Sequence, residues 1–222
     1  MTRSPRVSNI PLVGMYKDEI NRRERPRRTQ AERRGRTRRA FLGAARELFA
    51  EKGYAGVTIE EIVVRTGMTK GALYHHFEDK RSLLRAVVEE IEDELDEEVL
   101  GAAGKCRDED RDAFGAFMAG VYAYLDACLR QDVRQILLLD GPSVLGWAEW
   151  REIDAAHAIA QIEGGLKNLM DLEVVEAQPI TPLAHLIHAA AMAAALFIAT
   201  ADDSEKAREE MGNALRRLLE RL

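Results

Sequence analysis

The sequence predicts an all-α fold with a small three-helix unit near the N-terminus and a larger helical body after it. Only six of the 222 residues are proline, and alanine, leucine, glutamate and arginine are abundant, which favours helices. From residue 36 onward, apolar side chains recur mainly at the three-to-four spacing of amphipathic helices, which gives about nine of them. A chain that is 46% hydrophobic can bury one sizeable core and a second, smaller one.

The net charge of −6 conceals a strong asymmetry along the chain. Residues 1–90 contain 20 lysines and arginines against 12 acidic residues, whereas residues 91–222 contain 12 against 26. A basic front part on an acidic body suits binding to nucleic acid, because phosphates dominate such affinity while the body stays soluble.

Local chemistry in the stretch 57–84 predicts a helix-turn-helix followed directly by a third helix. Thr58 is placed to cap the first helix, with Glu61 completing a capping box. Gly67 supplies the left-handed residue that ends this helix, and Thr69 is the next cap. So short a turn fits two helices that cross steeply, which is how a second helix is presented to the major groove of DNA.

The second helix, predicted over 70–76, is unusually polar for barely two turns. Its polar side chains are Lys70, Tyr74, His75 and His76. Gly71 and Ala72 leave the backbone bare, so the helix is able to lie close to base edges. Asp79 then caps the helix that carries Lys80 in its first turn.

The run Gly71-Ala72-Leu73-Tyr74-His75-His76-Phe77, with Lys80 and Leu83-Leu84, resembles the DNA-binding signature of the TetR family of repressors. The resemblance covers residues 36–84. It implies that phosphates are held by Thr58, Tyr74, His75 and Lys80, and that bases are faced by Thr69, Lys70 and Gly71. Val63 and Thr66 depart from the alanines usual in the family. The alternative for these residues is a purely structural role, which we favour for Phe77 and Leu73 but not for Tyr74 and Lys80.

These patterns divide the chain into a basic arm (1–35), a helix-turn-helix domain (36–82) and a ligand-binding and dimerisation body (83–222). Positions 21–40 hold ten arginines and two glutamates. The arm is either a disordered, solvated tail or a segment whose arginines enter the minor groove beside the main site. The candidates for the second interpretation are Arg25, Arg27, Arg28, Arg33, Arg34 and Arg36.

The apolar spacing predicts helices over 37–52, 58–66, 70–76, 80–100, 114–130, 136–139, 147–172, 181–200 and 203–222. We expect residues 101–110 to break the fourth helix, and Asp140-Gly141-Pro142 to stop the sixth. The acidic run 89–98 is interpreted as a solvated helix face. The segment 137–154 also resembles a pattern that recurs in one large TetR subgroup.

Large, adaptable side chains in the body describe either an apolar ligand cavity or an ordinary core, and periodicity cannot separate the two. The resemblance favours an inducer cavity. The candidate lining residues are Phe114, Phe117, Met118, Tyr122, Trp147, Trp150, His157, Met170, His188 and Met192.

The last two helices are rich in small residues and suit a four-helix interface across a two-fold axis of a homodimer. The alternative is that they only complete the core of one chain. We place Ala194 and Leu215 in this interface.

Catalytic, cofactor and metal motifs are not found in the sequence. It contains no nucleophile elbow, phosphate-binding glycine loop or HExxH, and His185 and His188 lack a third metal ligand at matching spacing. Cys106 and Cys128 form no CxxC pattern, so reduced structural thiols are favoured over a redox sensor. We expect a cytoplasmic protein, because no signal peptide is evident and the apolar run 189–201 is too short to span a bilayer.

The sequence therefore predicts a dimeric one-component transcriptional regulator that is not an enzyme and has no cofactor. We expect a repressor that a small apolar ligand releases from a palindromic operator. The alternatives are a DNA-binding regulator that acts without a ligand or is controlled by another protein, and an enzyme or carrier in which the DNA-binding head (the helix-turn-helix domain, 36–82) is incidental.

Overall fold

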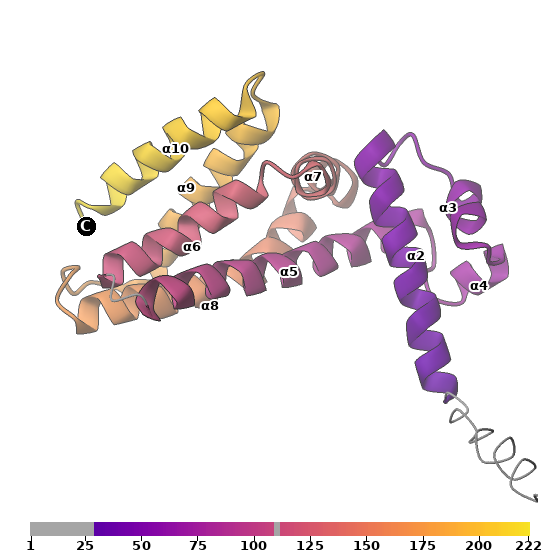
Figure 1. Cartoon of the computed structure of the whole chain (residues 1–222), viewed down its shortest axis with the longest axis horizontal. Coiled ribbons are helices and arrows are strands. Elements are labelled where there is room, and N and C mark those ends of the chain that lie inside the picture. The colour runs from indigo at the N-terminus through magenta and orange to yellow at the C-terminus, as the bar shows by residue number, and fades with distance from the viewer. Residues whose placement is uncertain (1–28, 109–111) are drawn as a thin grey trace, which may run out of the picture. The chain divides into compact units, whose positions relative to one another are not determined.

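The computed structural model describes residues 29–108 and 112–222, and the chain divides into two compact units, Met1–Thr37 and Arg38–Leu222. Within the described residues the structure contains nine α-helices and one π-helix and no strand, so the predicted all-α fold is confirmed (Figure 1).

The N-terminal helices are α2 (Gln30–Lys52), α3 (Ile59–Thr66) and α4 (Lys70–Tyr74). Their apolar faces meet in the small core that helical spacing predicted. The buried members of this core are Phe41, Phe49, Ile59, Ile62, Leu73 and Phe77. Phe77 and Leu73 are thus core residues, whereas the side chain of Tyr74 is half exposed.

Helix α2 begins at Gln30, so the helix start predicted at Thr37 is wrong, whereas the arm predicted over 1–35 lies mostly outside the described residues and stays a prediction. The cause is a capping box. The Glu32 amide donates to Thr29 Oγ1 at 3.2 Å, and the Thr29 amide donates to Glu32 Oε2 at 2.8 Å. Arg33, Arg34 and Arg36 are therefore exposed residues of a helix, whereas Arg25, Arg27 and Arg28 lie outside the described residues.

The body contains α5 (Lys80–Asp108), α6 (Ala113–Ala127), η1 (Val133–Asp140), α7 (Gly141–Leu145), α8 (Trp147–Asp171), α9 (Ile180–Thr200) and α10 (Ser204–Leu219). Helix α5 packs on α6 and α8, and α9 packs on α8 and α10 (Figure 1). Helices α5, α6, α8 and α9 surround a cavity.

Helix α5 continues to Asp108 instead of ending near Leu100 as predicted. Gly101 and Gly104 do not break it. Helix α6 packs along this end of α5, and this packing offsets the low helix propensity of glycine. The approach is close at Gly120 of α6, where an added Cβ would lie 3.2 Å from Val99 Cγ1.

The segment between α6 and α8 differs from the predicted short helix 136–139. It is a π-helix, η1, that begins after Asp132 and continues directly into α7. Pro142 does not stop the chain, since it occupies the first turn of α7, where a backbone N–H has no helical partner. Gly141 permits a tight contact with α8, because an added Cβ would lie 2.8 Å from Trp150 Cδ1.

Helix α9 is longer than the apolar run that the sequence singled out, and by length and composition alone it could cross a membrane. Half of its apolar window is buried inside the protein, however, including Ile187, Ala195 and Ile198. Burial of this kind is expected of a core helix in a helical bundle.

Candidate DNA-binding head and ligand cavity

The ends of α3 and the start of α4 are fixed by the side chains that the sequence predicted. Thr58 Oγ1 accepts from the Glu61 amide at 3.3 Å, and the Thr58 amide donates to Glu61 Oε2 at 2.8 Å. Gly67 adopts φ 66° and ends α3, and Thr69 Oγ1 accepts from the Ala72 amide at 3.2 Å. The helix-turn-helix is therefore set by contacts between residues close in the sequence.

Helix α4 ends at Tyr74, earlier than the predicted His76, and it presents its polar residues outward. Lys70, Gly71, Tyr74 and His75 are all exposed, and Lys70 forms an ion pair with the exposed Glu60. Leu73 on the opposite face is fully buried. This geometry leaves one face of α4 open to a macromolecular partner.

Lys80 has structural contacts that the sequence did not indicate. Its Nζ donates to the carbonyl oxygens of Tyr54 and Val57 at 2.8 Å each, and it lies 4.0 Å from the centre of the Tyr54 ring. Two of its three N–H groups are thus engaged in tying α5 to the turn between α2 and α3. The Tyr54 amide in turn donates to Asp140 Oδ2 of η1 at 2.7 Å.

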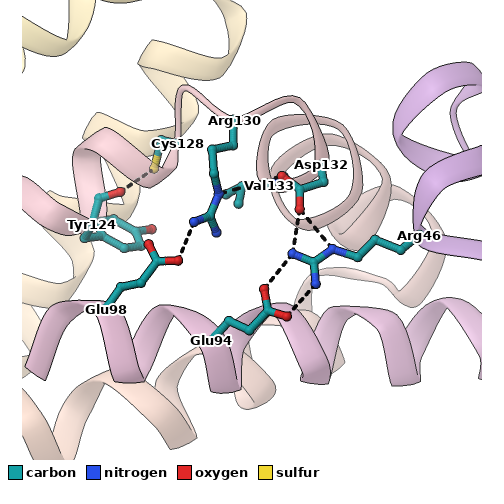
Figure 2. A network of polar contacts seen from close by, with 8 residues as sticks. All are labelled: Arg46, Glu94, Glu98, Tyr124, Cys128, Arg130, Asp132 and Val133. Carbon is teal, nitrogen blue, oxygen red and sulfur yellow. Dashed lines mark hydrogen bonds and ion pairs between the residues drawn. The ribbon is translucent and has the colours of Figure 1, made fainter. Parts of the chain in front are cut away.

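Arg46 of α2 is held between two carboxylates of the body (Figure 2). Both terminal nitrogens donate to Glu94 of α5 at 2.7 Å, and Nε and Nη2 donate to Asp132 Oδ2 at 2.9 and 2.6 Å. The Glu94 hydrogen bonds raise the pKa of Arg46 above its ordinary value despite partial burial. Arg130 and Glu98 extend the network along the same face of α5 (Figure 2).

A cavity of about 770 Å³ lies between α5, α6, α8 and α9. Its walls are mainly apolar, with Leu95, Val99, Phe117, Val121 and Ile187 among them. Its polar lining consists of Glu92, Asp96, Tyr124, Asp154, Gln161, Asn168 and His188. The volume is in the range of drug-sized ligand sites, about 300–1,000 Å³.

Only Phe117 and His188 among the ten predicted pocket residues line this cavity. Phe114, Met118, Tyr122 and Met170 belong to a separate apolar cluster with Leu166 and Leu219. Trp150 and Met192 lie in the main core, Trp147 is half exposed, and His157 reaches the cavity only through Asp96. The large side chains fill space, and the void lies where small residues of α5, α6, α8 and α9 face one another.

The buried polar groups of the cavity come from three different helices. His188 Nε2 of α9 lies 2.7 Å from Asp154 Oδ2 of α8, and both residues are 4% exposed. Asp96 of α5 lies 2.8 Å from His157 Nδ1 of α8. The acidic run 89–98, interpreted from the sequence as a solvated face, thus contributes Glu92 and Asp96 to the cavity instead.

Both cysteines are free and buried. Burial raises the pKa of Cys128 to about 12, and its thiol donates to the Tyr124 carbonyl at 3.2 Å. A thiol that stays protonated is a poor nucleophile, which agrees with a structural role. In residues 29–108 and 112–222 no group of three or more His, Cys, Asp or Glu side chains is arranged to hold a metal ion.

Two family models match the chain. Residues 41–87 match bacterial regulatory proteins of the tetR family, and residues 114–222 match a tetracyclin repressor-like C-terminal domain. A solved TetR-family transcriptional regulator from Pectobacterium atrosepticum is 34% identical and superposes with a TM-score of 0.76, over 86% of this chain and 96% of that one. The chain belongs to the TetR family.

Curated relatives agree with this assignment. The transposon Tn10 TetC protein of Escherichia coli is 26% identical over 68% of this chain and 75% of its own length. The HTH-type transcriptional regulator CymR of Pseudomonas putida is 38% identical over 38% of this chain and 41% of its own. The predicted function class is confirmed: the protein is a DNA-binding transcriptional regulator.

Proposed function

We propose that this TetR-family regulator is a homodimeric repressor that a small molecule in the α5–α6–α8–α9 cavity releases from a palindromic operator. The observation that carries the proposal lies on α5. Glu92 and Asp96 on one face of this helix line the cavity, while Glu94 on another face holds Arg46 of α2. A ligand that shifts α5 therefore acts on the helix that supports the DNA-binding head.

The coupling is a matter of linkage. If the ligand favours a disposition of the two heads that mismatches successive major grooves, it weakens operator binding, and the operator weakens ligand binding by the same factor. Since such a regulator acts where its DNA lies, we also propose that it is cytoplasmic.

We propose that DNA is contacted by the open face of α4 and its flanks. Thr69, Lys70 and Gly71 stand at the start of α4 and are exposed, as base contacts require. Thr58, Tyr74, His75 and the remaining N–H of Lys80 would meet phosphates. Arg33, Arg34 and Arg36 are exposed on α2 and would add a sequence-independent electrostatic contribution.

For the dimer we propose the outward faces of α9 and α10. Ala194 and Leu215 cannot serve as the sequence suggested, because they are only 2% and 6% exposed within one chain. The same helices expose Leu186, Phe197 and Leu218 at 69%, 50% and 57%. Large apolar side chains left open on two adjacent helices suit a self-complementary four-helix contact.

Selection from a random-sequence duplex library tests the DNA-binding proposal. The recovered sites should contain an inverted repeat, and Tyr74→Ala should bind them more weakly at unchanged helix content. Tyr122→Phe, on a body residue away from the head, is the control and should bind like the wild type. Recovery of sites without two-fold symmetry, or wild-type affinity for Tyr74→Ala, would contradict this assignment.

The interface is tested by sedimentation of the double variant Phe197→Glu, Leu218→Glu. It should be monomeric and should bind the selected operator much more weakly, because the two half-sites are no longer held together. Lys206→Glu with Glu210→Lys, an exchange of exposed charges on α10, should remain dimeric. An intact dimer of the apolar-to-charged variant would place the interface elsewhere.

A further inference from the structure

The charge of the cavity lining identifies the class of ligand that it takes. Three carboxyl groups line it, from Glu92, Asp96 and Asp154, and among the described residues no lysine or arginine does. From this arrangement we propose that the cavity binds hydrophobic organic cations, namely protonated amines with an apolar body, with Glu92 as the group that meets the ammonium. The binding site stands on its own geometry, whereas its regulatory effect rests on the function proposed above.

Glu92 is the carboxyl that has capacity for a ligand. It is 4% exposed, and its Oε1 is buried with no hydrogen-bond partner among the described residues. Burial raises the pKa of Glu92 well above its usual range, and the neighbouring Asp154, Asp96 and Asp93 raise it further. Leaving a buried carboxyl without a partner costs free energy, and an ammonium that enters the cavity removes that cost.

The other two carboxyls are already paired by the protein. Asp154 Oδ2 lies 2.7 Å from His188 Nε2, an ion-pair distance without hydrogen-bond geometry, and Asp96 lies 2.8 Å from His157 Nδ1 and also accepts from Gln161 Nε2. Each of these carboxyls therefore has a charged or polar protein group beside it, which Glu92 Oε1 lacks. A ligand cation would therefore sit nearest to Glu92 and be stabilised by all three groups.

The remaining walls suit the apolar body of such a ligand. Aliphatic side chains and small residues make up most of the lining, and Phe117 and Tyr124 offer aromatic rings to a cation. A ligand carboxylate or phosphate would face three acidic groups without a lysine or arginine in the described lining to compensate, which disfavours fatty-acid-like ligands and their thioesters with nucleotide groups.

A panel of matched compounds tests the proposal with the full-length protein. The panel comprises phenylbutyl, naphthylethyl and octyl bodies, each as the primary amine, the alcohol and the carboxylate, with affinity measured by isothermal titration calorimetry. We expect at least one amine to bind roughly tenfold more tightly than its matched alcohol, and the carboxylates to bind more weakly still. The proposal is overturned if no amine of the panel binds more tightly than both its matched alcohol and its matched carboxylate.

Variants locate the binding. Glu92→Gln keeps the shape of the side chain and should reduce the preference for the amine over the alcohol by about tenfold. Glu97→Gln removes the same charge from an exposed position of the same helix and should leave the preference intact. An undiminished preference in Glu92→Gln, with the variant folded by circular dichroism, would remove Glu92 from the site and sink the proposal.

The outcome is separable from that of the proposed function. An amine that binds in the cavity but leaves operator affinity unchanged supports the ligand class and contradicts ligand-controlled repression. If instead a carboxylate or an alcohol binds best and releases the operator, the ligand class is wrong while the regulatory function stands.

Discussion

The DNA-binding head and the cavity of the body differ in how their polar groups are satisfied. In the head, Thr58 and Thr69 take their partners from three residues away along the chain. In the cavity, Asp154 and His188 come from two different helices, and Glu92 keeps an oxygen without a partner among the described residues.

The difference indicates that the capping groups of the head are satisfied without DNA, whereas the polar groups of the cavity are not all satisfied without a ligand. A head whose helix ends are capped locally holds its shape whether or not DNA is present, which lowers the cost of ordering on binding. A cavity with an unsatisfied buried carboxyl is less stable empty than filled, so a suitable ligand gains affinity by relieving it.

The largest effect is expected at the junction between the two regions. Arg46→Ala removes four hydrogen bonds and leaves Glu94 and Asp132 facing each other, so urea denaturation should show a loss of about 2–3 kcal/mol. Arg65→Ala breaks only exposed pairs, with Glu47 and Glu51, and should cost less than about 1 kcal/mol. Equal losses in the two variants would mean that the junction carries no special stability.

A smaller loss is expected from Lys80→Met. The change leaves the carbonyls of Tyr54 and Val57 without their charged donor, which should lower the free energy of unfolding by about 1.5–2 kcal/mol. The matched control is Lys70→Met, where the lost partner is the exposed Glu60, and it should lower the free energy of unfolding much less than Lys80→Met does. If Lys80→Met is as stable as the control, the hydrogen bonds of Lys80 do not stabilise the fold and its proposed role is limited to DNA contact.

Glu92→Gln should stabilise the empty protein, and the gain should depend on pH. Because the pKa of Glu92 is raised in the folded state, only the unfolded chain ionises it as pH rises above the ordinary value of 4.5. The wild type should therefore lose stability relative to the variant by up to about 1.4 kcal/mol for each pH unit, until the folded carboxyl also ionises.

The gain is measured by thermal melting of both proteins from pH 4 to pH 8. Asp93, Asp96, Asp154, His188, Tyr124 and Cys128 also face this region and are present in both proteins. A constant difference in melting temperature across the series would show that Glu92 has no raised pKa.

The smallest effect on stability is expected on the open face of α4. Tyr74→Phe removes a hydroxyl from a half-exposed side chain and should change the free energy of unfolding by less than about 0.5 kcal/mol. Operator affinity, measured by fluorescence anisotropy, should nevertheless fall a few-fold if the hydroxyl meets a phosphate. A drop in stability without a drop in affinity would return Tyr74 to a structural role.

The sequence predicted the head well because its determinants are local. Each helix end there is marked by a capping residue that acts within three residues of its own position, namely Thr58 with Glu61, Gly67 and Thr69. The same kind of signal, Thr29 with Glu32, is present at the start of α2 but lies among many arginines. The helix start was therefore predicted at Thr37 and not at Gln30.

The cavity could not be predicted in the same way. Helical periodicity reports which face is buried, and Met118 and Trp150 are buried as expected, yet it does not report where packing leaves a void. Glu92 and Asp96 stand among exposed acids of the run 89–98, and only the packing of α8 and α9, distant in the sequence, distinguishes them.

The alternation along α5 has a consequence for how such regulators diversify. Residues 92 and 96 share one face of the helix, while residues 94 and 98 share the opposite one, as the α-helical repeat requires. A substitution at position 92 or 96 therefore alters what the cavity recognises without touching the contact between Glu94 and Arg46. New chemical signals can in this way be connected to an unchanged output through single point mutations.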